Sequence, residues 1–194
     1  LFKWMVKRVL VGAFIRRVDR FLCVGTATKR LYQSYSVDDS RLEWGPHAVD
    51  NDFFKMRATQ YRSSRYELRR KWGIADESTC VLFVGKFIQK KRPQDLILAV
   101  GLLRNLDQKR PYHILFVGAG ELGESLRSMS YVVFDEEFDS AIPRAGSTDD
   151  PVSSFAGFMN QTQLPQAYAA ADMLVLPSES ETWGLVINEA MASG

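Results

Sequence analysis

The chain has 194 residues, of which 46% are hydrophobic and 25% are charged, and its formal net charge is +2 at pH 7. This composition is ordinary for a soluble globular protein, and the small basic excess argues against a dedicated nucleic-acid surface. Cys23 and Cys80 lie within apolar runs without Cys-x-x-Cys or Cys/His spacing, so we expect buried free thiols in a reducing compartment and neither a disulfide nor a zinc site.

The N-terminal segment, residues 1–17, carries five basic residues among apolar residues spaced three and four apart, which predicts a helix. A basic amphipathic helix suits peripheral contact with an anionic membrane. The alternative, which we favour, is a connecting helix that packs on its own domain. The sequence has no run of about 18 apolar residues, so it predicts no membrane span. We expect a cytoplasmic protein, with peripheral contact at the inner membrane face as the option.

The rest of the chain alternates short apolar runs with helical patterns. We predict strands at 21–25, 80–84, 113–117, 154–158 and 173–176, helices at 26–35, 57–73, 92–104, 121–129 and 164–171, and a last helix that contains Glu189. An acidic irregular stretch, residues 135–154, separates two of these units, and we expect it to be mobile. Alternating β and α elements predict an α/β fold with a Rossmann-like, doubly wound parallel sheet.

Two glutamates frame the segment Glu181-Thr-Trp-Gly-Leu-Val-Ile-Asn-Glu189 near the end of the chain. Glu181 falls in the loop after a strand, where open α/β sheets bind their ligands, and Glu189 falls in the helix that follows. The amides of Gly184, Leu185 and Val186 lie near the start of that helix, where unpaired N–H groups and the helix dipole attract phosphate. A carboxylate on each side of an anion site suits a ligand with hydroxyls flanking a diphosphate, which describes a nucleotide sugar.

Residues 168–194 resemble the Glu-x7-Glu region of the family 4 retaining glycosyltransferases, which have the two-domain GT-B fold. Residues 46–54, 84–93 and 115–120 resemble further family segments in the same order, so the resemblance covers roughly residues 18–194. It implies transfer of a sugar from a nucleoside diphosphate sugar to a hydroxyl acceptor, such as a sugar or a lipid-linked sugar, with retention and without a metal. We expect a role in polysaccharide, glycolipid or glycoconjugate synthesis, including cell envelope polysaccharide.

The resemblance also implies domain limits. Residues 1–44 correspond to the end of the N-terminal acceptor domain and the inter-domain link, and residues 45–194 to a nucleotide-sugar-binding domain that is incomplete at its C-terminus. We therefore expect an interior fragment of a longer protein, inactive in transfer by itself.

Site roles follow from the same resemblance. Lys86 and Lys91 are expected on the diphosphate, Glu189 on the ribose hydroxyls and Glu181 beside the transferred sugar. The remaining residues expected beside the nucleotide are Gly184, Leu185, Val186, Trp183, Gly118 and Met159. The family usually has arginine where Lys86 stands, so this chain has a point charge in place of a bidentate fork. Lys90 and Arg92 are neighbours that could be mistaken for the phosphate ligands.

Other interpretations remain open. A non-catalytic nucleotide-binding domain would keep the same fold. The run Gly118-Ala-Gly-Glu-Leu-Gly123 matches the dinucleotide pattern G-x-G-x-x-G, with Asp135 or Glu136 as ribose acceptor, and would suit an NAD-dependent dehydrogenase. That motif follows a complete β-α unit and leaves the glutamates unexplained, so we favour the transferase.

Two further features look structural. Asp50-Asn-Asp52 spells the Asp-x-Asp metal motif, but its position between Pro46 and Phe53 suggests an inter-domain turn. No other ligand cluster accompanies it, so we expect no metal and no cofactor. His47 and His113 have no catalytic partner nearby in the sequence and are expected to be structural.

Overall fold

The computed structural model describes residues 2–107, 109–138, 147 and 149–194, with side chains from residue 8 onward. The chain divides into two compact units, Leu1–Ala48 and Val49–Gly194. The division falls four residues after the predicted boundary between residues 44 and 45, and the two units are described separately below.

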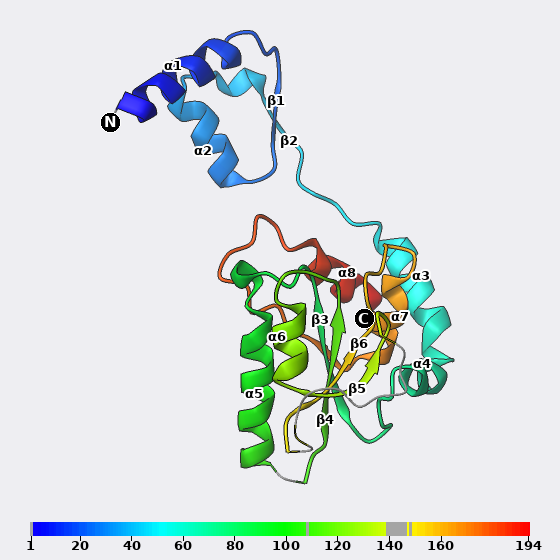
Figure 1. Ribbon diagram of the computed structural model, residues 1–194. Helices are drawn as coiled ribbons and strands as arrows, with labels where there is room; N and C mark the ends of the chain where they lie inside the picture. Colours follow the sequence, from blue (N-terminus) through cyan, green and yellow to red (C-terminus); the bar gives the residue numbers. More distant parts are fainter. Residues whose placement is uncertain (1, 108, 139–146, 148) are drawn as a thin grey trace. The chain divides into compact units, whose positions relative to one another are not determined.

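The first unit is small (Figure 1), and it has its own core. Helix α1 (Phe2–Ile15) precedes strand β1 (Phe21–Cys23), helix α2 (Thr26–Ser34), a 3-10 turn (Asp39–Arg41) and strand β2 (Leu42–Trp44). The two strands pair in parallel, with Phe21 opposite Leu42. Buried Ile15, Phe21 and Val37 form the core, around which neighbouring apolar side chains pack. The helices and the first strand predicted here are present, whereas β2 was not predicted.

The second unit is built on a five-stranded sheet of order β5-β6-β4-β3-β7, in which every neighbouring pair is parallel. Its strands are β3 (Thr79–Val84), β4 (Tyr112–Val117), β5 (Tyr131–Asp135), β6 (Val152–Phe155) and β7 (Met173–Leu174). This arrangement confirms the Rossmann-like α/β prediction. The central strands β3 and β4 are buried apolar runs because helices cover both faces of a parallel sheet.

Side chains that alternate along the strands enter two separate cores. Cys80, Leu82 and Val84 of β3 face α3 (Asn51–Arg62), α4 (Arg65–Lys71), α7 (Leu164–Ala170) and α8 (Leu185–Ser193). Val81 and Phe83 face α5 (Pro93–Leu106) and α6 (Gly123–Ser128). Figure 1 shows α5 and α6 together on one side of the sheet and α3, α4 and α7 on the other. Full burial of side chains such as Phe83 contributes about 2–3 kcal/mol each.

Local sequence explains where the helices begin. The Asp50 carboxylate accepts a hydrogen bond from the Phe53 N–H at 2.9 Å and thereby caps α3. Pro93 stands at the first position of α5, where its missing N–H has no cost. Arg92, immediately before it, adopts a left-handed conformation with φ of 50°, which is unusual for a residue with a side chain.

The structure corrects several predicted elements. The turn expected at 50–52 is the start of α3, and the helix expected over 57–73 is two helices, with a break at Ser63 and Ser64. Strand β5 lies where no strand was predicted, and β6 begins two residues before the predicted strand at 154. The acidic stretch 135–154 is therefore partly strand. Residues 139–146 and 148, on which the mobility prediction also falls, lie outside the described residues.

Candidate functional site at the carboxyl edge of the sheet

Four of the predicted site residues follow the carboxyl ends of strands. Lys86 follows β3, Gly118 follows β4, Met159 lies after β6 and Glu181 after β7. Because all the strands are parallel, these loops emerge at one edge of the sheet, the edge at which open α/β sheets bind ligands.

The neighbours β3 and β7 form a switch point in this edge. They pair in parallel, with Leu82 opposite Leu174. The helix after β3, α5, packs on one face of the sheet, whereas the helix after β7, α8, packs on the other. The chain therefore leaves these two strands toward opposite faces of the sheet, and such switch points are where open α/β sheets bind their ligands.

Two direct contacts join the loops that follow β3 and β7. The Glu179 N–H donates to the Lys90 carbonyl oxygen at 3.0 Å. The Lys91 Nζ lies 2.5 Å from Glu181 Oε1, and each of these side chains is 24% exposed. The two residues that sequence comparison assigned to the diphosphate and to the sugar are thus an ion pair in this structure.

The pair has a clear electrostatic consequence for Glu181. Partial burial by itself raises the pKa of the Glu181 carboxyl. The hydrogen bond and positive charge of Lys91, with further contributions from Ser178 and Lys90, outweigh that effect and hold the pKa below its usual value. Glu181 is therefore a carboxylate at neutral pH, and its charge is shared with a lysine that a phosphate would also attract.

The other basic residues of the β3–α5 loop differ from Lys91. Lys86 is exposed and forms no ion pair with any carboxylate of the described chain. Arg92 pairs with Asp95 of its own helix at 2.7 Å. Lys90 is exposed and meets the β7 loop through its backbone carbonyl. Of these basic residues, Lys91 is the one that pairs with Glu181 in the described chain. Its expected contact with the diphosphate stays a prediction.

Gly184 brings the start of α8 against Glu181. It has φ of 75°, and a Cβ at this position would lie 3.8 Å from Glu181 Cγ. The amides of Leu185 and Val186 form the first turn of α8, where N–H groups have no acceptor within the helix. Trp183 is 36% exposed immediately before this turn. The arrangement places helix-terminal donors beside a carboxylate and a lysine.

Glu189 is buried, with 4% exposure, and is the fifth residue of α8. The Tyr168 hydroxyl, on α7, donates to Glu189 Oε2 at 2.8 Å. Burial and then the negative charge of Glu189 raise the pKa of Tyr168 far above its usual range, so the phenol stays protonated. The sequence analysis missed Tyr168, because nothing in the pattern Tyr-Ala-Ala-Ala distinguishes a buried hydrogen-bond donor from a core aromatic residue.

The glycines of the dinucleotide-like run are explained by a close approach between two loops. A Cβ at Gly118 would lie 2.0 Å from the Gly85 carbonyl oxygen, and one at Gly120 would lie 2.6 Å from the Phe87 oxygen. The Phe87 N–H in turn donates a hydrogen bond to the Ala119 carbonyl oxygen at 3.0 Å. These glycines are therefore required by backbone packing, independently of any pyrophosphate.

The proposed ribose acceptor of that alternative motif is already engaged. Arg127 binds Asp135 through two hydrogen bonds, at 2.6 and 3.1 Å, and Asp135 is only 8% exposed. Glu136 is exposed next to it. Because Arg127 already binds the Asp135 carboxylate, Asp135 is a poor ribose acceptor, and this weakens the dehydrogenase interpretation further.

The remaining predicted residues have structural surroundings. Met159 is partly buried against the core that α3, α7 and α8 share with the sheet. Asp50 caps α3, and across the described ranges no group of three or more His, Cys, Asp or Glu side chains could hold a metal ion. Metal independence remains a prediction. His113 is 2% exposed, and its Nε2 lies 2.8 Å from Ser154 Oγ.

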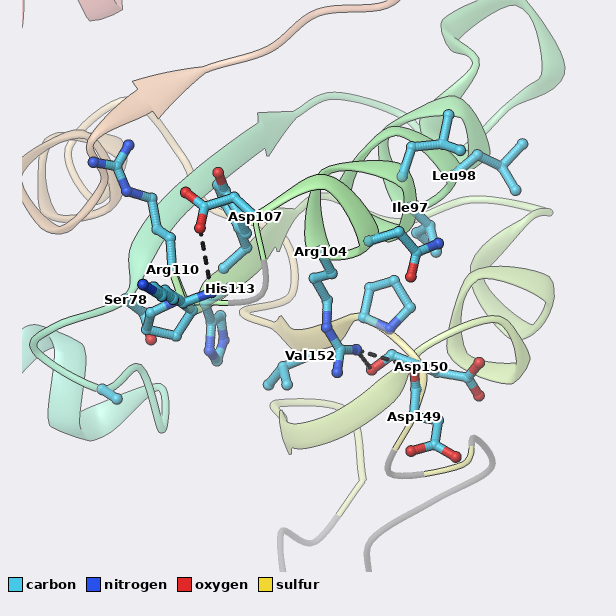
Figure 2. Close-up of a pocket in the computed structure, with 18 of the residues that line it drawn as sticks. Ser78, Ile97, Leu98, Arg104, Asp107, Arg110, His113, Asp149, Asp150 and Val152 are labelled. Atoms are coloured by element: carbon cyan, nitrogen blue, oxygen red, sulfur yellow. Dashed lines mark hydrogen bonds between the residues drawn. The ribbon is translucent and has the colours of Figure 1, made fainter.

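A large cavity lies at the opposite, amino-terminal edge of the sheet (Figure 2). Its volume is about 1320 Å³, and it lies between the end of α5 and the starts of β4 and β6. Arg104 reaches across it to the carbonyl oxygens of Asp149 and Asp150 at 3.0 and 2.5 Å. None of the predicted site residues lines this cavity, so its size does not make it the candidate site.

Comparison with known proteins gives a consistent family. A family model described as Glycosyl transferases group 1 matches residues 78–194. Sulfoquinovosyl transferase SQD2 of Arabidopsis thaliana is 30% identical over 197 aligned residues, which cover 100% of this chain and 33% of the relative. A D-inositol 3-phosphate glycosyltransferase of Nocardia farcinica is 30% identical over 185 residues, covering 93% of this chain and 37% of the relative. The chain thus spans about a third of the length of these curated relatives.

Solved structures share the fold. The crystal structure of Anabaena Alr3699/HepE in complex with UDP and glucose has a TM-score of 0.64 at 20% identity, over 96% of this chain and 45% of that one. WaaG, a glycosyltransferase involved in lipopolysaccharide biosynthesis, has a TM-score of 0.62 at 21% identity, over 89% of this chain and 41% of that one.

Proposed function

Because the chain belongs to the group 1 glycosyl transferases, which have the GT-B fold, we propose that it forms the nucleotide-sugar-binding domain of a retaining enzyme. The enzyme would transfer a sugar from a nucleoside diphosphate sugar to a hydroxyl acceptor. Residues 45–194 would bind the donor, and residues 1–44 would be the end of the acceptor domain and the link.

The observation that supports this best is the Lys91–Glu181 pair at the β3–β7 switch point. A lysine suited to phosphate lies 2.5 Å from a carboxylate suited to sugar hydroxyls. The start of α8, at Gly184, lies against the same carboxylate. A nucleotide sugar presents a diphosphate next to a ring of hydroxyls, and this site presents cations and helix amides next to a carboxylate.

The proposed chemistry uses these charges directly. Lys86 and Lys91 would stabilise the negative charge that grows on the diphosphate as its bond to the anomeric carbon breaks. The acceptor oxygen would form its bond on the same face, and its proton would pass to the departing diphosphate oxygen. The configuration is thereby retained, and positioning and electrostatics supply most of the rate enhancement.

The other contacts of the donor follow from their places at the edge. Glu189 would accept hydrogen bonds from the ribose hydroxyls. Gly184, Leu185 and Val186 would contribute amides to the diphosphate. Trp183, Gly118 and Met159 would lie beside the nucleotide. We propose that the site works without a metal or a resident cofactor.

A calorimetric panel tests the binding function. UDP, GDP and ADP, their sugars and NADH are titrated into the chain with and without EDTA. We expect one nucleoside diphosphate and its sugar to bind regardless of EDTA, since the cations are lysines. Binding of NADH alone would favour the dehydrogenase, and loss of nucleotide binding with EDTA would favour Asp50 and Asp52 as metal ligands.

Transfer is tested separately from binding. Because catalysis in a GT-B enzyme takes place between two domains, we propose that residues 1–194 alone bind donor weakly and transfer nothing. Proton NMR of the anomeric centre, with a chain that carries both domains, would show retention. Tight donor binding without turnover in that longer chain would favour the non-catalytic alternative.

A cytoplasmic location is part of the proposal, with peripheral membrane contact through residues 1–17 as the alternative to the favoured connecting helix that packs on its own domain. Val9, Leu10 and Phe14 of α1 are 68%, 65% and 68% exposed, while Ile15 packs into the core of the first unit. No helix among the described residues is long and apolar enough to cross a membrane. Co-sedimentation with vesicles of anionic lipid, lost in a Leu10→Ser/Phe14→Ser variant, would support the contact, and sedimentation equal to that with neutral lipid would contradict it.

A further inference from the structure

We propose that Tyr168 is a positioning residue that fixes the Glu189 carboxylate in the orientation needed to bind the ribose of the donor nucleotide. The inference rests on the proposed function, since it needs Glu189 to be the ribose ligand. Tyr168 itself touches no part of the expected donor and would act only through Glu189.

The geometry limits how Glu189 can turn. The Tyr168 hydroxyl donates to Glu189 Oε2 at 2.8 Å, and this is the one hydrogen bond that the carboxylate accepts from described residues. Oε1 is left for another donor. A hydrogen bond from a neutral phenol to a charged carboxylate is among the stronger side-chain contacts, so it holds the carboxylate plane as well as its position.

Packing fixes the donor. Tyr168 is 9% exposed, and its ring lies 6.1 Å from that of Phe54 on α3, centroid to centroid. The hydroxyl is therefore held by the contact of α7 with α3, whereas the carboxylate it binds belongs to α8. Because Tyr168 remains protonated at neutral pH, its hydroxyl has one proton to donate.

The consequence concerns ribose recognition specifically. A glutamate has three side-chain torsions, and without the phenol the carboxylate would turn among rotamers that do not face the ribose hydroxyls. Contacts to the diphosphate come from Lys86, Lys91 and the α8 amides, which Tyr168 does not touch. Loss of the hydroxyl should therefore weaken ribose recognition and leave diphosphate recognition intact.

A ligand comparison tests this. Whichever of UDP, GDP and ADP binds most tightly is titrated by calorimetry into the wild-type chain, Tyr168→Phe and the control Tyr61→Phe, alongside its 2′,3′-dideoxy analogue. Tyr61 lies on α3, and among the described residues its hydroxyl accepts one hydrogen bond, of 3.4 Å, from Gln166 of α7. Tyr168→Phe removes one oxygen and keeps the ring on Phe54. Thermal unfolding and circular dichroism check that each variant is folded.

The wild type and Tyr61→Phe should prefer the ribonucleotide over the dideoxy analogue by about tenfold, the scale for hydrogen bonds to a charged group. In Tyr168→Phe this preference should fall below about threefold, with affinity for the dideoxy analogue unchanged. A merely structural role would weaken both ligands by the same factor, and that result, or a preference kept at the wild-type value, would overturn the inference. If the wild type showed no preference for the ribonucleotide over the dideoxy analogue, Glu189 would not be the ribose ligand, and this inference would fall with that assignment.

A double-mutant cycle gives a second, independent measurement. Glu189→Gln keeps an oxygen for the Tyr168 hydroxyl but removes the charge that the ribose hydroxyls bind. If Tyr168 acts through Glu189, adding Tyr168→Phe to Glu189→Gln should change the ribose preference by less than about twofold. Additive effects of the two substitutions would overturn the inference.

Discussion

Replacing Glu181 with glutamine should tighten the binding of a bare nucleoside diphosphate. In this structure Lys91 is paired with Glu181 at 2.5 Å, whereas the proposed function places it on the diphosphate. The diphosphate and the carboxylate would then compete for one ammonium group. Glu181→Gln keeps the side-chain shape and removes that competition.

The exposure of the pair sets the size of the effect. Each side chain is 24% exposed, so the pair lies between exposed pairs, worth about 0.2–1 kcal/mol, and buried ones, whose disruption costs about 3–5 kcal/mol. We expect a gain of about 1 kcal/mol, or about fivefold in Kd, for UDP, GDP or ADP measured by calorimetry.

Two controls separate competition from general electrostatics. Glu179→Gln removes an exposed charge from the same loop without touching Lys91, and it should change Kd by less than about twofold. In a Lys91→Ala background the gain from Glu181→Gln should vanish. Unchanged or weaker binding by Glu181→Gln, or an equal gain from Glu179→Gln, would refute the competition between phosphate and Glu181.

Four further results are expected. In a chain with both GT-B domains, Lys91→Ala should lower turnover by about two to three orders of magnitude, the scale for the loss of one electrostatic donor. The control Lys90→Ala should leave turnover nearly unchanged. Equal effects of the two substitutions would mean that the wrong lysine was assigned to the diphosphate. Glu189→Ala should weaken nucleoside diphosphate binding by about 1–3 kcal/mol in calorimetry, and unchanged affinity would remove the ribose contact. Burial, and then the charge of Arg69, lower the pKa of His113 from 6.5 to about 4. As the pH falls from 6.5 towards 4, the unfolded state therefore binds a proton before the folded state does. The free energy of unfolding should fall by roughly 3 kcal/mol over that window. Urea unfolding at pH 7 and pH 4.5 would show a steeper loss in the wild type than in His113→Gln, and parallel losses would contradict this. Gly118→Ala should lower the free energy of unfolding by more than about 2 kcal/mol, because its Cβ would lie 2.0 Å from the Gly85 oxygen at φ of 133°, and a stable variant would show that the loops separate easily.

The parts of the fold that the sequence predicted well are those with strong local patterns. The apolar runs of β3 and β4 and the Pro93 start of α5 are visible without tertiary information. The Ser63–Ser64 break between α3 and α4 and the short strand β5 are less visible. In β5 a register shift between Val132 and Phe134 interrupts the alternation by which a strand is recognised.

The contacts of the site depend on packing that no local pattern specifies. Lys91 and Glu181 are 90 residues apart in sequence and meet because the crossover after β6 places β7 beside β3. Tyr168 and Glu189 meet because α7 and α8 share one face of the sheet. The family resemblance could therefore suggest roles for the lysines and the glutamates. It could predict neither the ion pair between Lys91 and Glu181 nor the hydrogen bond between Tyr168 and Glu189.

The central claim is that a nucleoside diphosphate binds at the carboxyl edge of the sheet, between β3 and β7. Calorimetry with the tightest-binding of UDP, GDP and ADP tests it on two double variants, Lys86→Ala/Lys91→Ala at this edge and Lys109→Ala/Arg110→Ala at the cavity of the opposite edge. Each variant removes two positive charges from the chain. We predict a loss of at least about 100-fold for the first and less than about twofold for the second. A greater loss for Lys109→Ala/Arg110→Ala would contradict the account and place the nucleotide in the amino-edge cavity.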